Sequence, residues 1–193
     1  MLLSSVDFAG IERLQHAGDW PATARLLAAE ARAIQAGGAD FLLIGTNTMH
    51  KVAPEIEAAI DIPLLHIADA TAHRLQADGV TRVGLLGTRF TMEQDFYKGR
   101  LQERFGLEVL VPDDAARERV HRIIYDELCL GDIRESSQAE YLAIIADLAQ
   151  AGAQAVILGC TEIALLVGAC QAAVPLYDTT AIHAEAAVTL ALA

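Results

Sequence analysis

The stretch GADFLLIGTNT at residues 38–48 decides the fold class, because GAQAVILGCTE at residues 152–162 repeats its pattern. Each copy has a glycine turn, an apolar run, a second glycine and then small polar residues where a helix can begin. An apolar run bounded by glycines is typical of a strand that is buried on both faces of a parallel sheet. The repeat therefore predicts two related α/β halves that present Thr46 and Cys160 at equivalent places.

Apolar runs alternate with longer amphipathic stretches along the chain, which is the pattern of a parallel sheet with crossover helices. We expect strands at residues 2–6, 40–45, 63–67, 80–86, 107–111, 155–159 and 174–177. We expect helices at residues 19–37, 50–59, 69–78, 91–105, 113–130, 137–151, 162–171 and 181–192. Helices are expected to end at Gly79, Gly106 and Gly152. The patterns that begin at Thr91 and Ser137 are typical of capping boxes, which place a helix start there.

The composition restricts the class of protein. The 193 residues are 53% hydrophobic and carry a formal net charge of −12, and Lys51 and Lys98 are the lysines. Nucleic acids and anionic membranes are bound by clustered Lys and Arg, so we expect neither as a partner. The three cysteines show no CxxC spacing and the six histidines form no ligand cluster. We therefore expect no metal and a reduced, cytoplasmic setting.

The two strand ends are the candidate site. A glycine lets a ligand approach the backbone, and a following helix offers N–H groups that suit a carboxylate. Because a helix N-terminus lowers the pKa of a thiol, we expect Cys160 to be partly ionised. The alternative is that Cys160 is a small buried residue and that Thr46 is a helix N-cap. Cys129 and Cys170 lack this context, and we interpret both as packing residues.

Six stretches spread over the chain resemble the cofactor-independent aspartate/glutamate racemase superfamily, and most closely its bacterial broad-specificity or L-aspartate/glutamate-specific amino-acid racemases. They are GTNTMHK at 45–51, HIADAT at 66–71, LLGTRFTME at 85–93, IYDELCLG at 124–131, GCTE at 159–162 and DTTAIH at 178–183. The resemblance implies two pseudo-symmetric half-domains, each a parallel sheet flanked by helices, with the active site in the cleft between them. It places 1–62 and 175–193 in the first half-domain and 63–174 in the second.

The resemblance also implies an acid/base pair on opposite faces of the substrate's α-carbon, without a cofactor. The family usually has two cysteines in these roles; Cys160 matches the second, and Thr46 stands where the first would be. Because an alkanol is a poor base, we expect Cys160 to remove the α-proton and Thr46, or a water on it, to return one. The two directions of catalysis should then be unequal. The substrate-binding residues implied by the resemblance are Asn47, Thr48, Thr91, Thr161 and Glu162, the last of which orients the site.

Two departures from the family pattern shape the expectation. Cys129 stands where some relatives have a lysine that grips an acidic side chain, which allows neutral amino acids as substrates. Family members begin with a strand and a Gly-Gly-Met-Ser-like loop, and this chain starts after them, so we expect an incomplete first half-domain.

We therefore expect an isomerase, a cytoplasmic and homodimeric amino-acid racemase acting on aspartate, glutamate or a broader set of small-molecule amino acids. The alternatives are a single-cysteine decarboxylase or isomerase of the same superfamily, and a truncated, inactive binder of small carboxylates.

Overall fold

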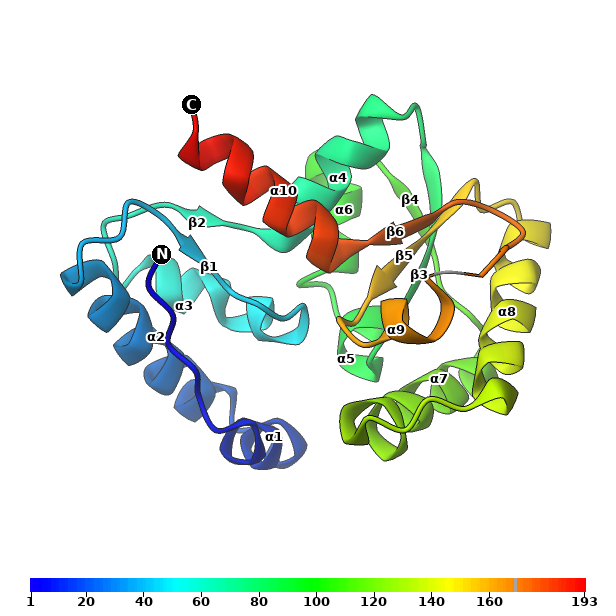
Figure 1. Cartoon of the computed structure of the whole chain (residues 1–193), viewed down its shortest axis with the longest axis horizontal. Coiled ribbons are helices and arrows are strands. Elements are labelled where there is room, and N and C mark those ends of the chain that lie inside the picture. Colours follow the sequence, from blue (N-terminus) through cyan, green and yellow to red (C-terminus); the bar gives the residue numbers. More distant parts are fainter. Residues whose placement is uncertain (169) are drawn as a thin grey trace. The chain divides into compact units, whose positions relative to one another are not determined.

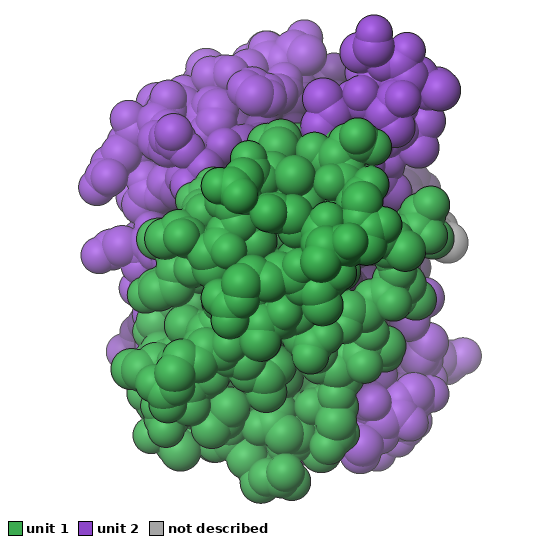
Figure 2. All heavy atoms as spheres, turned by 90° about the vertical axis from the view of Figure 1, so that its left-hand side faces the viewer, with its two compact units in different colours: residues 1–44, 49–66 green, residues 45–48, 67–193 purple. Residues whose placement is uncertain are grey.

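The computed structural model describes residues 1–168 and 170–193. The chain divides into two compact units, which Figure 2 colours separately: unit 1 is Met1–Ile44 with Met49–His66, and unit 2 is Gly45–Thr48 with Ile67–Ala193. Each unit contains parallel strands accompanied by helices (Figure 1). The predicted α/β class is therefore confirmed.

Unit 1 is built on a short parallel pair of strands, β1 (Leu42–Leu43) and β2 (Leu64–Leu65). Its other elements are α1 (Phe8–Ala17), α2 (Trp20–Ala36), the 3₁₀ helix η1 (Thr48–Val52), which begins in the loop of unit 2, and α3 (Ala53–Glu57). Alanines at positions 24, 28 and 31 form the buried stripe of α2, at the spacing of one helix face. They pack in a core with Leu42, Val52, Ile56 and Ile60.

The predicted strand at residues 2–6 is wrong. Residues 1–7 have no regular secondary structure, and α1 follows them unpredicted. A strand needs a hydrogen-bonded neighbour, and no strand in the described parts of the chain pairs with residues 2–6. Signals for α1 were present: Asp7 accepts a hydrogen bond from the Ala9 N–H at 3.1 Å, and Gly18 ends the helix at φ 69°.

Within residues 67–168 and 170–193, unit 2 builds a parallel sheet with the strand order β4-β3-β5-β6. The strands are β3 (Arg82–Gly87), β4 (Glu108–Leu110), β5 (Ala155–Gly159) and β6 (Leu176–Asp178). The helices α4 (Ile67–Ala77), α6 (Lys98–Phe105) and α10 (Thr179–Ala191) lie on one side of this sheet, and α7 (Asp114–Asp126) and α8 (Glu135–Gln150) lie on the other (Figure 1). All five residues of β5 are buried, as predicted for a strand covered on both faces.

Short helices in unit 2 depart from the predicted ones. The helix expected at 91–105 is two, α5 (Arg89–Glu93) and α6, because Gln94 leaves helical conformation at ψ 150°. Thr88, and not Thr91, is the N-cap of α5, and Ser137 lies inside α8, so both predicted capping boxes are wrong.

The ends of several elements also bear on the predictions. The helix expected at 162–171 is α9 (Ile163–Val167), and position 169 lies outside the described residues. The 3₁₀ helix η2 (Leu128–Leu130) follows α7. The predicted stops at Gly79, Gly106 and Gly152 are confirmed, because each has a positive φ that favours glycine.

The compact units divide the chain elsewhere than the resemblance implies. Residues 175–193 were expected to join 1–62, but β6 is hydrogen-bonded to β5, with Val156 opposite Leu176, and α10 packs on α4. Both elements therefore belong to unit 2. Across the described residues, every helix is too short or too polar to cross a bilayer.

Candidate active site

The carboxyl ends of β3 and β5 lie side by side, and each strand ends in glycine. Gly87 is directly opposite Gly159 in the parallel register. A Cβ at Gly159 would lie 2.8 Å from the Leu86 carbonyl oxygen, and one at Gly87 would lie 3.0 Å from the Gly159 carbonyl oxygen. The two strand ends therefore approach each other more closely than any larger residue allows, and Cys160 follows directly.

Cys160 is in contact with a carboxylate. Its thiol donates a hydrogen bond to Oε2 of Glu162 at 2.8 Å, and the Thr161 hydroxyl donates to the same oxygen at 2.7 Å. Cys160, Thr161 and Glu162 are all half-buried. The structure thus brings these three predicted site residues together.

The predicted ionisation of Cys160 is wrong. Burial raises the pKa of the thiol well above its ordinary value, and the charge and hydrogen bond of Glu162 raise it further, with a contribution from Cys129. The helix that was expected to lower this pKa, α9, spans only five residues. Burial and the adjacent carboxylate therefore outweigh the helix N-terminus, and the thiol is favoured over the thiolate.

Asn47 ties the loop Gly45–Thr48 to the end of β5. Its Nδ2 donates to the Thr179 hydroxyl at 3.0 Å, and that hydroxyl donates to the Leu158 carbonyl oxygen at 2.9 Å. Leu158 is two residues before Cys160. The loop that carries Thr46 is therefore fixed at the sheet edge that carries Cys160.

Thr48 ties the same loop to the end of β3. Its hydroxyl lies 3.2 Å from that of Thr88, which lies 3.3 Å from the hydroxyl of Thr91. The three side chains are buried and form a continuous chain of hydroxyls. Two predicted substrate-binding residues, Thr48 and Thr91, are thereby joined.

Thr88 is a residue of this network that the sequence reasoning missed. Its position repeats the glycine-then-small-polar pattern of Gly45-Thr46 and Gly159-Cys160, because it directly follows Gly87. It also caps α5, since its hydroxyl accepts a hydrogen bond from the Thr91 N–H at 3.4 Å. The repeated pattern, extended to a third copy, could have found it.

Asn47 also presents an unused acceptor. Its side chain is 2% exposed, and Oδ1 has no hydrogen-bond partner among the residues that the structure describes. A buried oxygen without a partner costs free energy, on the order of 1–3 kcal/mol. A ligand N–H that reached this oxygen would recover part of that cost.

The titratable groups near Cys160 are acids. Tyr141 on α8 is buried, donates to the Val120 carbonyl oxygen at 3.1 Å, and has a raised pKa because of burial and then the negative charges of Cys160 and Glu127. Cys129, on η2, packs half-buried against the core of unit 2, in keeping with its interpretation as a packing residue. Among the described residues there is no group of three His, Cys, Asp or Glu side chains that could hold a metal ion.

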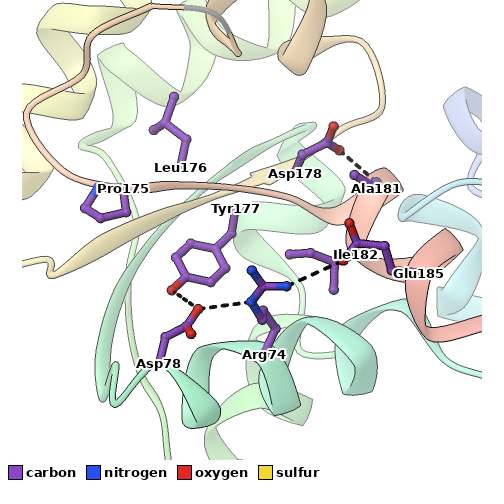
Figure 3. Close-up of a pocket in the computed structure, with 9 residues that line it drawn as sticks. All are labelled: Arg74, Asp78, Pro175, Leu176, Tyr177, Asp178, Ala181, Ile182 and Glu185. Carbon is purple, nitrogen blue, oxygen red and sulfur yellow. Dashed lines mark hydrogen bonds and ion pairs between the residues drawn. The ribbon is translucent and has the colours of Figure 1, made fainter. Parts of the chain in front are cut away.

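A separate pocket of about 290 Å³ lies between α4, β6 and α10. Figure 3 shows that its polar side chains point toward one another: Tyr177 donates to Asp78 at 2.8 Å, and Arg74 bonds both Asp78 and Glu185. The arginine charge is already compensated by two carboxylates. None of the predicted site residues lines this pocket, so we place the candidate active site at the ends of β3 and β5.

The fold and the strand-end cysteine define a class of protein, and comparison with known families agrees. Residues 1–187 match the family model described as Asp/Glu/hydantoin racemase. The chain therefore belongs to the Asp/Glu/hydantoin racemase family, as its six motifs predict.

Individual relatives support this assignment. The chain is 27% identical over 156 residues to the broad specificity amino-acid racemase RacX of Bacillus subtilis (strain 168), which covers 81% of the chain and 66% of RacX. It thus spans just under two thirds of that relative's length. A candidate Asp/Glu racemase from Yersinia pestis is 56% identical with a TM-score of 0.92, covering 100% of this chain and 84% of that one. PH1733, an aspartate racemase homologue from Pyrococcus horikoshii OT3, is 32% identical with a TM-score of 0.85, covering 100% and 83%.

Proposed function

We propose that the protein is a cofactor-independent amino-acid racemase in which Cys160 and Thr46 form the acid/base pair. The carrying observation is that the Thr46 loop is anchored to the two strand ends that flank Cys160, through Asn47 to Thr179 and through Thr48 to Thr88. This arrangement suits a reaction in which two groups act on one carbon atom. The broad specificity amino-acid racemase RacX among the relatives supports the same reaction class.

The buried polar groups suit the two ends of an amino acid. Oδ1 of Asn47 can accept a hydrogen bond from the ammonium group, and the hydroxyls of Thr48, Thr91 and Thr161 can rotate to donate to the carboxylate. Bound in this way, the substrate presents its α-carbon to the residues at the strand ends. We therefore assign these four residues to substrate binding.

Thr46 makes the two faces of the site chemically unequal. A thiol can exchange its proton near neutral pH more readily than an alcohol, whose proton is held far more tightly. We assign Cys160 to one face of the α-carbon and Thr46, or a water that it holds, to the other. Racemisation should therefore run at different rates in its two directions.

The side-chain preference follows from Cys129. Relatives that grip an acidic side chain use a lysine at this place, and Cys129 offers no positive charge. We propose that neutral amino acids are accepted in addition to aspartate and glutamate. The cytoplasmic location and the homodimer stay predictions.

One observation favours a second candidate, a single-cysteine decarboxylase or isomerase. Loss of CO₂ from a substrate leaves a carbanion that needs only a proton donor, and the raised pKa of Cys160 holds it as a thiol. Racemisation demands in addition that one group act as a base. The two candidates therefore differ in whether α-hydrogen exchange occurs with ordinary amino acids.

The test is solvent exchange at the α-carbon. L-aspartate, L-glutamate and L-homoserine are incubated with the protein in deuterated water, and the α-proton signal is followed by NMR. A racemase should erase this signal for at least one of them, Cys160→Ala should abolish the exchange, and Cys170→Ser should retain it. Absence of exchange with all three amino acids, or exchange that survives Cys160→Ala, would contradict the assignment.

A further inference from the structure

Glu162 is bound to the candidate catalytic thiol itself. One oxygen of its carboxylate, Oε2, accepts hydrogen bonds from both Cys160 at 2.8 Å and Thr161 at 2.7 Å. Three consecutive residues therefore close a compact polar turn around a single carboxylate oxygen. A thiol hydrogen that points at this oxygen has a defined direction, which an isolated cysteine side chain lacks.

The surroundings offer the sulfur little compensation for a negative charge. The titratable groups that act on Cys160 are Glu162 from its own turn and Cys129 from η2, and Tyr141 of α8 senses both Cys160 and Glu127. All of these are acids. A thiolate formed beside an ionised Glu162 would place two like charges in contact, which is unfavourable in a half-buried site.

We propose that Glu162 is a positioning residue that governs the proton of Cys160. Its carboxylate keeps the hydrogen on the sulfur in the substrate-free protein, and it receives that proton when the sulfur has to act as a base. This role rests on the proposed racemase function and gives Glu162 a task beyond contact with the substrate.

The proton balance closes over one turnover. The S–H bond of Cys160 breaks and an O–H bond forms on Glu162, while the electron pair stays on sulfur. The thiolate then takes the α-proton, and the carbanion accepts a proton from Thr46 or the water on it. The oxygen that gave this proton recovers one from the Glu162 carboxyl through solvent, so the protein returns to its starting state. In the opposite direction Cys160 donates directly, because its hydrogen is already in place.

The test measures the acidity of Cys160 without measuring catalysis. The protein is alkylated with iodoacetamide over a range of pH, and each cysteine-containing peptide is quantified by mass spectrometry, with Cys129 and Cys170 as internal references. Only the thiolate reacts appreciably, so the midpoint of the pH profile reports where Cys160 ionises. Glu162→Gln keeps the shape of the side chain and removes its charge. It should lower the Cys160 midpoint by about one pH unit, and so raise the alkylation rate below that midpoint roughly tenfold.

Two further variants make the result specific. Glu108→Gln removes the same charge from an exposed side chain that pairs with Arg82 at the start of β3, at the other edge of the sheet, and should leave the midpoint unchanged. Glu162→Asp keeps the charge with a shorter reach and should give an intermediate midpoint. An unchanged midpoint in both Glu162 variants, or an equal shift in Glu108→Gln, would overturn the proposal.

The outcome is separable from that of the racemase assignment. A lowered midpoint in Glu162→Gln with no α-hydrogen exchange in the wild-type protein supports Glu162 as the partner of the thiol and rejects the racemase. Exchange in the wild-type protein with no shift in the midpoint retains the racemase and rejects the role of Glu162.

Discussion

Gly87 and Gly159 face each other across the ends of two adjacent strands, and neither position has room for a side chain. Gly159→Ala would place a Cβ 2.8 Å from the Leu86 carbonyl oxygen, and backbone cannot give way as a flexible side chain can. We expect a loss of about 1–3 kcal/mol in the free energy of unfolding, measured by urea denaturation. Gly45→Ala is the matched control, because an added Cβ there meets nothing within 4 Å, and it should change stability by less than about 0.5 kcal/mol. Equal stabilities of the two variants would contradict this account.

Thr88 should matter through its hydroxyl group. That oxygen caps α5 by accepting from the Thr91 N–H, and it also contacts the hydroxyls of Thr48 and Thr91. Thr88→Ala should therefore lower the free energy of unfolding by about 1–2 kcal/mol, whereas Thr88→Ser, which keeps the hydroxyl, should lose much less. If the serine variant were as unstable as the alanine variant, the methyl group and not the hydroxyl would carry the effect.

Tyr177 makes stability depend on alkaline pH. Burial, and then the hydrogen bond and charge of Asp78, raise its pKa from 10.0 to about 12. The neutral phenol is thus favoured in the folded state, so its contribution is complete below about pH 10. It is lost as the pH rises from there toward about 12. Urea unfolding at pH 8 and pH 11 should show a smaller loss in Tyr177→Phe than in the wild-type protein.

The partner of Tyr177 provides the control for this pH effect. The pKa of Asp78 is lowered by its hydrogen bond from Tyr177 and then by Arg74. Asp78→Asn should move the pKa of Tyr177 downward, toward its ordinary value, in an ultraviolet titration from which the Tyr177→Phe spectrum is subtracted. An unchanged titration would show that burial alone sets the pKa of Tyr177.

Thr46→Cys would place a thiol on each face of the substrate. With two groups of similar acidity, the forward and reverse rates of racemisation should become more alike than in the wild-type protein. The measurement is the initial rate from each pure enantiomer, followed by chiral chromatography, with Thr46→Ser as the variant that keeps a hydroxyl. A rate ratio that stays the same in Thr46→Cys would remove Thr46 from the acid/base pair.

Strands of unit 2 were predictable because their physical cause is local. The apolar run of β5 and the glycine stops at Gly79, Gly106 and Gly152 carry their structural meaning in a few consecutive residues. Residues 2–6 show the limit of such patterns. Their apolar character resembles that of a strand, yet strand formation depends on a neighbour that no local pattern reveals.

The candidate site shows the same limit in chemical terms. The spacing of Cys160 and Thr46 within the repeated motifs was readable from the sequence, and so was the set of residues around them. The protonation of Cys160 was not, because it depends on burial and on the contact with Glu162, both of which arise only in the folded chain. Sequence reasoning weighed the helix N-terminus and had no means of weighing the carboxylate beside it.

The hydrogen bond between Asn47 and Thr179 has a consequence for biosynthesis. It joins positions separated by 132 residues, so the loop that carries Thr46 cannot be fastened to β5 until nearly the entire chain has left the ribosome. Contacts of such long sequence separation form late and slowly. A nascent chain that is stalled or cleaved before Thr179 would possess Cys160 and Thr46 without the link that sets them in place, and the site should mature only when α10 has formed.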